Sequence, residues 1–368
     1  MHFFYARPGK PGAFFAAPAA TKTNCRINRR TTMKAILMTE TGTADVLEYV
    51  EVPDPVPAAG EVVIRVQSAA VNFADIARRR GDRYPEPTPM PFTPGMEVAG
   101  TVAAIGENVA GLEVGTPVFG TVGRYSNGGY AELAVTQQAN VIPLPPGVDS
   151  DLAAGLLAVG STATLILTEV AGLAEGETVF IPAAAGGVGS YAVQIAKALG
   201  AKKIIAGAST PEKREIALSQ GAHHAIDYRR PDWPDQVRAL TEGKGVDVAL
   251  EMTGPKHLPT ALAALAPFGR LITYGAVTGL EGHHLDGDAL TPLIYDPAPG
   301  QSLTGFNLGV WFALRPEVTI GAVGKLIGWI AEGTISGPPI HTMPLADAAE
   351  AHRLLESGSS TGKLILKP

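Results

Sequence analysis

The sequence predicts an α/β protein that combines a β-rich domain with a doubly wound parallel sheet. The residues after Met33 contain short runs of Val and Ile that are separated by glycine and proline. From about residue 160 onward, apolar runs alternate with helical patterns, and a glycine-rich turn separates one of these runs from the next helix. Such alternation is typical of a parallel sheet covered by helices on both faces.

The β-rich domain is predicted from residues 33–150. Its four apolar runs are Glu61–Gln67, Glu97–Ala103, Thr116–Gly120 and Tyr130–Val135. Short runs of this kind, bounded by turn residues, favour a mostly antiparallel sheet. A further run at Gly362–Lys367 predicts a strand at the end of the chain.

The parallel sheet is predicted from four apolar runs suited to buried strands. They are Thr178–Ile181, Lys203–Ala206, Asp247–Leu250 and Leu271–Tyr274. After the first of them, apolar residues recur at intervals of four, three and four, from Val188 to Leu199. This spacing marks one face of a helix.

Composition excludes several classes of protein. A single cysteine among 368 residues cannot form an internal disulfide or a cysteine-based zinc site. The net charge is −6, and residues 33–368 carry an excess of acids that would repel a nucleic-acid backbone. The uncharged stretch Leu152–Thr168 has 17 residues and is too short for a membrane span, so we expect a buried helix there.

The first 32 residues differ from the rest, because they contain six basic residues and no acid. This composition suits a transit peptide. Alternatively, translation starts at Met33, which opens a strand-like run. We therefore expect a leader over residues 1–32 that takes no part in the fold.

A glycine-rich turn, Pro182–Gly189, follows the predicted strand Thr178–Ile181 and precedes the helix. Gly186 and Gly189 match the last two glycines of a dinucleotide-binding turn, and Ala184 replaces the first. Glycine allows backbone N–H groups to approach a pyrophosphate at the positive end of a helix. The order of strand, turn and helix therefore predicts a dinucleotide site.

Charge at the next strand indicates which dinucleotide binds. NAD-binding proteins carry an acid at the tip of this strand. Here Ser209 and Thr210 occupy the tip, and Lys213 and Arg214 follow. Hydroxyls and cations suit a 2′-phosphate and favour NADPH, although a solvated basic start of the next helix would give the same pattern.

The turn Ala183–Gly189 and the segment Gln194–Lys202 closely resemble the zeta-crystallin-like quinone oxidoreductases, a zinc-independent group within the medium-chain dehydrogenase/reductase superfamily. Further segments continue the match in order: Val71–Asp75, Arg80–Gly81, Tyr84–Pro85, Pro94–Gly100, Gly221–Ala222, Ala225–Tyr228, Thr253–Gly254, Tyr274–Gly275 and Gly362–Lys363. The resemblance implies a GroES-like catalytic domain from residues 33–157 and 300–368, and a Rossmann domain from residues 158–299. It also implies NADPH in the cleft between them and a cytoplasmic homodimer.

The resemblance also assigns site residues. Gly186, Gly187, Val188 and Gly189 would hold the pyrophosphate. Ser209, Lys213 and Tyr228 would hold the 2′-phosphate. Thr162, Gly254, Gly275 and Lys363 would complete the cofactor site. Asn72 and Tyr84 would face the substrate, unless Asn72 only caps a helix and Tyr84 only packs in the cleft wall.

Zinc ligands are missing from the expected positions. Zinc-dependent relatives need thiolate, imidazole and carboxylate ligands in the first domain. Between Met33 and Ala222 the chain has no Cys and no His, and Met96 stands where the superfamily motif has histidine. We therefore expect no metal. A hydride can still pass to an acceptor whose own conjugation absorbs charge, and the protein then mainly positions the two reactants.

Three functions remain open at this point. The first is an NADPH-dependent quinone reductase. The second is an NADPH-dependent reductase of activated double bonds, such as enones, alkenals or haloacrylates. The third is a non-catalytic NADPH-binding protein, which would bind the cofactor without consuming it. The expected partner of either enzyme is a small molecule, not nucleic acid or a membrane.

Overall fold

The computed structural model describes residues 32–275, 290–291, 293, 295 and 300–368, which belong to one compact unit. The predicted leader lies outside the described residues except for Thr32, which begins strand β1. The predicted α/β class with a β-rich sheet and a parallel sheet is confirmed. No helix in the described part of the chain is long and apolar enough to cross a membrane.

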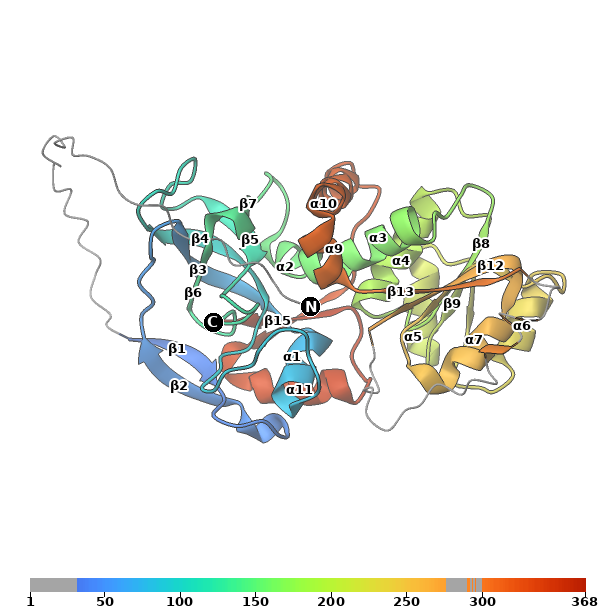
Figure 1. Cartoon of the computed structure of the whole chain (residues 1–368), viewed down its shortest axis with the longest axis horizontal. Helices are drawn as coiled ribbons and strands as arrows, with labels where there is room; N and C mark the ends of the chain where they lie inside the picture. The colour runs from blue at the N-terminus through green and yellow to red at the C-terminus, as the bar shows by residue number, and fades with distance from the viewer. Residues whose placement is uncertain (1–31, 276–289, 292, 294, 296–299) are drawn as a thin grey trace, which may run out of the picture. The chain divides into compact units, whose positions relative to one another are not determined.

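The β-rich part contains a seven-stranded sheet (Figure 1). Its strands are β3 (Glu61–Ala70), β4 (Glu97–Ile105), β5 (Pro117–Thr121), β6 (Leu133–Gln137), β7 (Val141–Pro143), β14 (Ile340–Pro344) and β15 (Lys363–Lys367). All pairings are antiparallel except the one between β14 and β15. A separate antiparallel pair is formed by β1 (Thr32–Leu37) and β2 (Glu48–Pro53). The predicted C-terminal strand thus pairs with the middle of the β-rich sheet, through β3.

Short helices accompany this sheet. They are α1 (Phe73–Arg80), α2 (Ser150–Ala154) and α11 (Ala348–Glu356), with 3-10 turns at Ala44–Val46, Gln138–Asn140 and Leu345–Asp347. Helix α1 ends at Gly81, whose φ of 84° is a left-handed conformation that favours glycine. It is preceded directly by Asn72, so the start of α1 places the first predicted substrate residue.

The second sheet has six parallel strands in the order β10-β9-β8-β11-β12-β13. Their bounds are β8 (Thr178–Ile181), β9 (Lys203–Gly207), β10 (His224–Ile226), β11 (Val246–Glu251), β12 (Leu265–Tyr274) and β13 (Ser302–Phe306). The chain runs outward from β8 to β10 and then returns to β11 on the other side of β8. The strand order therefore reverses between β8 and β11, where doubly wound sheets bind ligands beyond the carboxyl ends of the strands.

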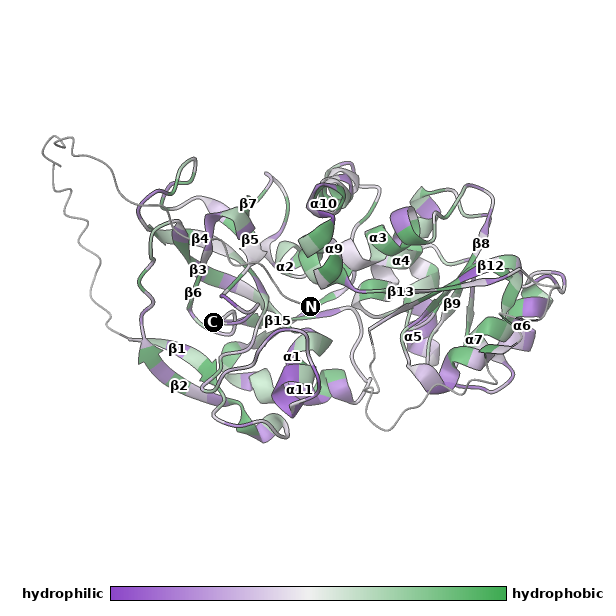
Figure 2. Cartoon of the chain, viewed as in Figure 1, coloured by the Kyte–Doolittle hydropathy of each residue, from purple (hydrophilic) through white to green (hydrophobic). Residues whose placement is uncertain are grey.

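Helices cover both faces of the parallel sheet. They are α4 (Gly187–Ala198), α5 (Pro211–Ser219), α6 (Trp233–Leu240) and α7 (Leu258–Ala263), with a 3-10 turn at Pro255–His257. Val179 and Ile181 pack with α4, whereas Phe180, between them, packs with Trp233 of α6. Successive side chains of β8 therefore pack into two different cores. Figure 2 shows the hydrophobic residues along β8 and β12.

The predicted buried helix is present but is interrupted. Helix α3 (Ser161–Leu165) lies between π-helical turns at Leu156–Gly160 and Ile166–Val170, and most of these residues are buried. Helix α3 contacts α10 (Pro316–Ala331), which follows α9 (Leu308–Leu314).

Candidate functional site

The glycine-rich turn has the tight geometry that its sequence predicts. Strand β8 ends at Ile181 and α4 begins at Gly187, with the Gly186 N–H donating to the Ala183 carbonyl at 2.8 Å. A Cβ at Gly189 would lie 2.3 Å from the Ala183 oxygen and 2.7 Å from the Ala184 Cα. Only glycine allows the helix to pack this closely against the turn.

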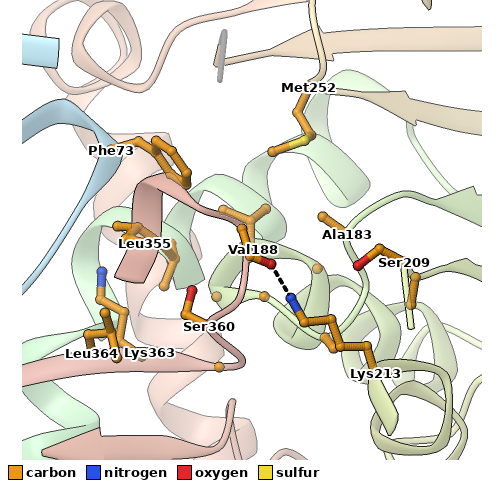
Figure 3. Close-up of a pocket in the computed structure, with 18 of the residues that line it drawn as sticks. Phe73, Ala183, Val188, Ser209, Lys213, Met252, Leu355, Ser360, Lys363 and Leu364 are labelled. Carbon is orange, nitrogen blue, oxygen red and sulfur yellow. Dashed lines mark hydrogen bonds between the residues drawn. The ribbon is translucent and has the colours of Figure 1, made fainter. Parts of the chain in front are cut away.

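A cavity of about 250 Å³ opens at the carboxyl ends of the parallel strands (Figure 3). The turn contributes Ala183 and Ala185–Gly189. Residues near the ends of β9 to β12 contribute Ala208, Ser209, Tyr228, Met252, Thr253 and Tyr274. The β-rich part and neighbouring segments contribute Val71–Phe73, Val159, Leu355, Gly358, Ser360 and Gly362–Leu364, and α5 contributes Lys213. No Asp or Glu is among these described lining residues, whereas two lysines are.

Nine of the thirteen residues predicted for the site line this cavity. They are Asn72, Gly186, Gly187, Val188, Gly189, Ser209, Lys213, Tyr228 and Lys363. The other four, Tyr84, Thr162, Gly254 and Gly275, are not among the described residues that line it. Thr162 is buried in α3, Gly254 follows β11 and Gly275 follows β12.

Ser209 and Lys213 form one end of the cavity. Thr210 caps α5 by accepting the Lys213 backbone N–H at 3.3 Å, and this fixes the first turn from which the Lys213 side chain extends. The Lys213 ammonium donates to the Gly358 carbonyl at 2.5 Å (Figure 3). Burial and the nearby Arg229 lower the pKa of Lys213.

Two acids flank this end in sequence, Glu212 beside Lys213 and Asp227 beside Tyr228. Glu212 is exposed at the start of α5, and the charge of Asp227 is offset. Arg229 pairs with the Asp227 carboxylate at 2.9 Å, and Arg214 lies 3.9 Å from it. Arg229 also donates to the Ser209 carbonyl. These arginines leave the corner favourable to an anion.

Three buried polar side chains meet at the other end. The Asn72 amide donates to Glu97 Oε1 at 3.0 Å and accepts from Lys363 Nζ at 2.5 Å. Lys363 Nζ is also 3.5 Å from Glu97 Oε1, and the other Glu97 oxygen accepts the Ala158 N–H. Burial lowers the pKa of Lys363, and the Glu97 and Asp75 charges oppose this shift. Mutual pairing makes three polar groups tolerable at a buried position.

A second buried chain of groups lies behind Asn72. Asp75 accepts the backbone N–H groups of Asn72 (2.9 Å) and Gly95 (3.1 Å) and the Tyr130 hydroxyl (3.3 Å). The Tyr130 hydroxyl is also 3.1 Å from His352 Nε2. Tyr130 is fully buried, and its hydroxyl is engaged by these two groups. The chain therefore fixes the start of α1 at the cavity wall.

Burial shifts the pKa values of two of these hydrogen-bonded side chains, His352 and Asp75. The pKa of His352 falls from 6.5 to about 3 because of burial and the Arg79 charge, and the pKa of Asp75 rises from 3.8 to about 6 because of burial. The folded His352 is harder to protonate, so its contribution to stability is lost as pH falls from 6.5 toward 3. The folded Asp75 is harder to ionise, so its contribution is lost as pH rises from 3.8 toward 6. Between about pH 6 and 4 the two effects oppose each other.

Tyr84 lies on a loop after α1. Its ring lies against the Arg78 guanidinium, whose Cζ is 5.2 Å from the ring centroid. Burial raises the pKa of Tyr84 to about 12, with the Asp75 and Glu86 charges contributing. The phenol is therefore neutral at physiological pH.

The donor set of the β-rich part does not fit a catalytic zinc ion. Met96 occupies the position of the expected histidine, and its thioether is a poor ligand for zinc. Among the described residues, no group of three or more His, Cys, Asp or Glu side chains could hold a metal ion.

Several residues of the site were not predicted from the sequence as site residues. Phe73, Met252, Leu355 and Ser360 line the cavity, and Glu97 joins Asn72 to Lys363. A signal existed only for Glu97, because it is an isolated carboxylate in the apolar run of β4. An acid inside such a run requires a buried partner.

Comparison with known proteins follows the same division of the chain. Residues 58–146 match the family model described as alcohol dehydrogenase GroES-like domain, and residues 187–293 match the one described as zinc-binding dehydrogenase.

Individual relatives match over most of the chain. A quinone oxidoreductase from Pseudomonas aeruginosa is 34% identical and covers 91% of this chain and 99% of its own. The structure of Escherichia coli quinone oxidoreductase complexed with NADPH is similar with a TM-score of 0.82 and 29% identity, covering 91% of this chain and all of that one. A CurK enoyl reductase structure is similar with a TM-score of 0.79 and 28% identity, covering 92% and 99%.

Proposed function

This chain belongs to the quinone oxidoreductase family of the medium-chain dehydrogenase/reductase superfamily, and we propose that it is an NADPH-dependent enzyme that reduces a quinone-type acceptor without zinc. One observation carries the proposal. The cavity lies where the strand order reverses between β8 and β11, and its described lining contains the glycine-rich turn and two lysines but no carboxylate. The NADPH complex of the E. coli relative supports the choice of cofactor.

The residues of the cavity fit NADPH. Gly186–Gly189 and the start of α4 would hold the pyrophosphate, because a helix N-terminus with exposed N–H groups attracts phosphate. Ser209, Lys213 and Tyr228 would hold the 2′-phosphate. We propose that Thr162, Gly254, Gly275 and Lys363 complete the site. NADPH supplies a hydride when it is bound.

The chain itself would position the acceptor and exclude water. Phe73, Val159, Met252 and Leu355 give the cavity apolar walls. Asn72 is held rigid by Glu97 and Lys363, and Tyr84 would orient the acceptor from its loop. An acceptor held in a dry site at reacting distance needs no metal if its own conjugation spreads the incoming charge.

The ligand inventory supports zinc independence. The sequence from Met33 to Ala222 offers neither a thiolate nor an imidazole. Elemental analysis of the purified protein should therefore find no stoichiometric zinc, and chelators should leave the activity unchanged. About one zinc per chain, with activity lost on chelation, would contradict this part of the proposal.

We also propose the domain division that the family resemblance implies, with a GroES-like domain from residues 33–157 and 300–368 and a Rossmann domain from residues 158–299. Because β13 pairs in parallel with β12, the second boundary is better placed after Phe306 than at residue 299. A cytoplasmic location and a homodimer are proposed from the resemblance alone.

A reductase of activated double bonds is the second candidate. The similarity to an enoyl reductase structure favours it, as does a cavity whose apolar walls offer few polar anchors for one acceptor. A quinone and an enone need the same thing from the site, which is correct positioning, since both are conjugated and electron-poor.

The decisive experiment measures NADPH oxidation against a panel of quinones, enones and alkenals. The highest kcat/KM is expected with a quinone. A clear preference for an enone or alkenal would select the second candidate. NADPH binding without turnover on any acceptor would leave a non-catalytic binding protein.

A further inference from the structure

We infer that Arg78 is a positioning residue that joins two loops to helix α1, whose start lines the cavity, and holds the Tyr84 ring, an inference that rests on the proposed role of Tyr84. The first loop contains Tyr84–Thr88 and follows α1. The second contains Tyr125 and Ser126 and follows β5.

The guanidinium bonds to both loops at once. Arg78 Nε donates to the Thr88 hydroxyl at 3.1 Å, and Nη2 donates to the Pro87 carbonyl at 2.6 Å. On the other loop, Nη1 donates to the Ser126 carbonyl at 3.0 Å and to the Tyr125 carbonyl. Charged donors form the stronger hydrogen bonds in proteins. One side chain therefore holds two segments that are far apart in sequence.

The faces of the same group contact aromatic rings. Arg78 Cζ is 5.2 Å from the Tyr84 ring centroid and 4.4 Å from that of Phe92. A planar guanidinium can donate in its plane and stack with its faces, which an ammonium cannot do. Glu86, which is 3.7 Å from Nη1, accepts the Ser126 hydroxyl at 3.1 Å and adds a second link between the loops.

The position of Arg78 on α1 connects these loops to the cavity wall. Asn72 precedes α1 and Asp75 lies in its first turn, and both are fixed by the buried polar groups described above. Arg78, one turn after Asp75, transmits that fixed position to Tyr84. Removing the guanidinium should therefore release Tyr84 while Asn72 stays in place.

Arg79 provides a matched control. Arg78 and Arg79 are neighbours on the same helix, and each is 2% exposed. Arg79 forms two hydrogen bonds with the Glu356 carboxylate, and within the described residues its side chain makes no hydrogen bond, ion pair or ring contact with either loop. Replacing either arginine removes a buried cation, but only Arg78 holds Tyr84.

The test compares Arg78→Met, Arg78→Lys and Arg79→Met in steady-state kinetics and in NADPH binding followed by fluorescence. For Arg78→Met, kcat/KM for the acceptor should fall by about 10²-fold, because a displacement of about 1 Å can cost that much, and the Kd for NADPH should not change. Arg78→Lys should not restore the rate, because it keeps the charge but not the planar group. Arg79→Met should lower thermal stability and leave the acceptor KM unchanged.

A double-mutant cycle with Tyr84→Ala completes the test. If Arg78 acts through Tyr84, the double variant should be no worse than Tyr84→Ala alone. The inference would be overturned if the losses in kcat/KM of the two single variants multiplied in the double variant. It would also be overturned if Arg78→Met weakened NADPH binding as much as it lowered kcat/KM, or if Arg79→Met showed the same acceptor defect. If Arg78→Met does not fold, the cycle is run with Arg78→Lys. If Tyr84→Ala alone leaves acceptor kinetics unchanged, the proposed role of Tyr84 fails and the inference fails with it.

Discussion

Replacing Lys213 by alanine should change the choice between NADPH and NADH. The Lys213 side chain extends from the first turn of α5 into the corner of the cavity that contains Ser209 and Tyr228. In the structure its ammonium donates to the Gly358 carbonyl at 2.5 Å. A 2′-phosphate would have to replace this bond, so binding exchanges one hydrogen bond for a stronger one.

The size of the effect follows from that exchange. The Lys213 ammonium is charged in both bonds, so the gain comes from replacing a neutral carbonyl acceptor with a charged phosphate oxygen. An ion pair at 4 Å is worth about 1 kcal/mol in water and about 4 kcal/mol near a protein surface. We take the gain as about 1–2 kcal/mol, in the lower part of this span, which corresponds to a factor of about 5–30 in affinity. Lys213 is partly exposed, and solvent screening places the expected loss near the lower end of this range. The paired state of Asp227 supports the estimate, because Arg229 and Arg214 offset the negative charge of this carboxylate.

The assay measures KM and Kd for both cofactors in Lys213→Ala and in the wild type. NADPH binding should weaken by about 5- to 10-fold, and NADH binding should change little because NADH lacks the 2′-phosphate. Lys202→Ala, which removes an exposed lysine before β9, is the matched control and should change neither value. Equal losses for the two cofactors, or a wild type that prefers NADH, would refute this interpretation of the corner.

Three further predictions concern single residues. Tyr84→Phe should keep most of kcat if the ring only orients the acceptor, whereas loss of a general acid would cost about 10²–10⁴-fold, so steady-state kinetics separate the two roles. Gly189→Ala should weaken NADPH binding and lower Tm, because its Cβ would meet the Ala183 carbonyl at 2.3 Å, whereas Gly324→Ala, which meets open space in α10, should not; binding titrations and thermal melts that do not distinguish the two variants would contradict this. Wild type loses stability as pH falls, because the buried His352 imidazole stays neutral while the unfolded chain binds a proton. His352→Gln lacks this effect, so the free energy of unfolding of the variant minus that of wild type should rise by about 3 kcal/mol from pH 6.5 to pH 4. Urea unfolding at several pH values measures this difference, and parallel pH profiles would disprove it.

The parallel half of the fold could be predicted because its signals are local. The run Thr178–Ile181, the turn after it and the helical spacing from Val188 to Leu199 each depend on neighbours in sequence, and the structure forms β8 and α4 at these positions. The corner that contains Ser209 and Lys213 could be predicted for the same reason, since both residues follow the end of β9 closely in the sequence. Their placement in one cavity agrees with the geometry of a doubly wound sheet.

The contacts around α1 were harder to predict from the sequence, because their residues meet only through tertiary contacts. A run of three arginines at Arg78–Arg80 is typical of a solvated helix face, yet Arg78 and Arg79 are buried. Their partners are loop carbonyls and Glu356, which the local sequence does not indicate. Leu355 and Ser360 come to the cavity in the same way, from segments far from the glycine-rich turn in sequence.

The contacts of Asn72 limit what this residue can do in catalysis. Its amide oxygen accepts from Lys363 and its amide nitrogen donates to Glu97, so one N–H and one lone pair remain for other partners. Its backbone N–H donates to Asp75, and Asn72 also lines the cavity. The start of α1 is held by the Asn72 backbone N–H, whereas the Asn72 amide is aimed by Glu97 and Lys363, so a place at the helix start does not prevent the amide from facing the cavity. Rigid support of this kind lowers the cost of ordering the site when the acceptor binds. The acceptor would therefore be selected mainly by the shape of the apolar walls and the position of the Tyr84 loop, with Asn72 as a fixed reference point.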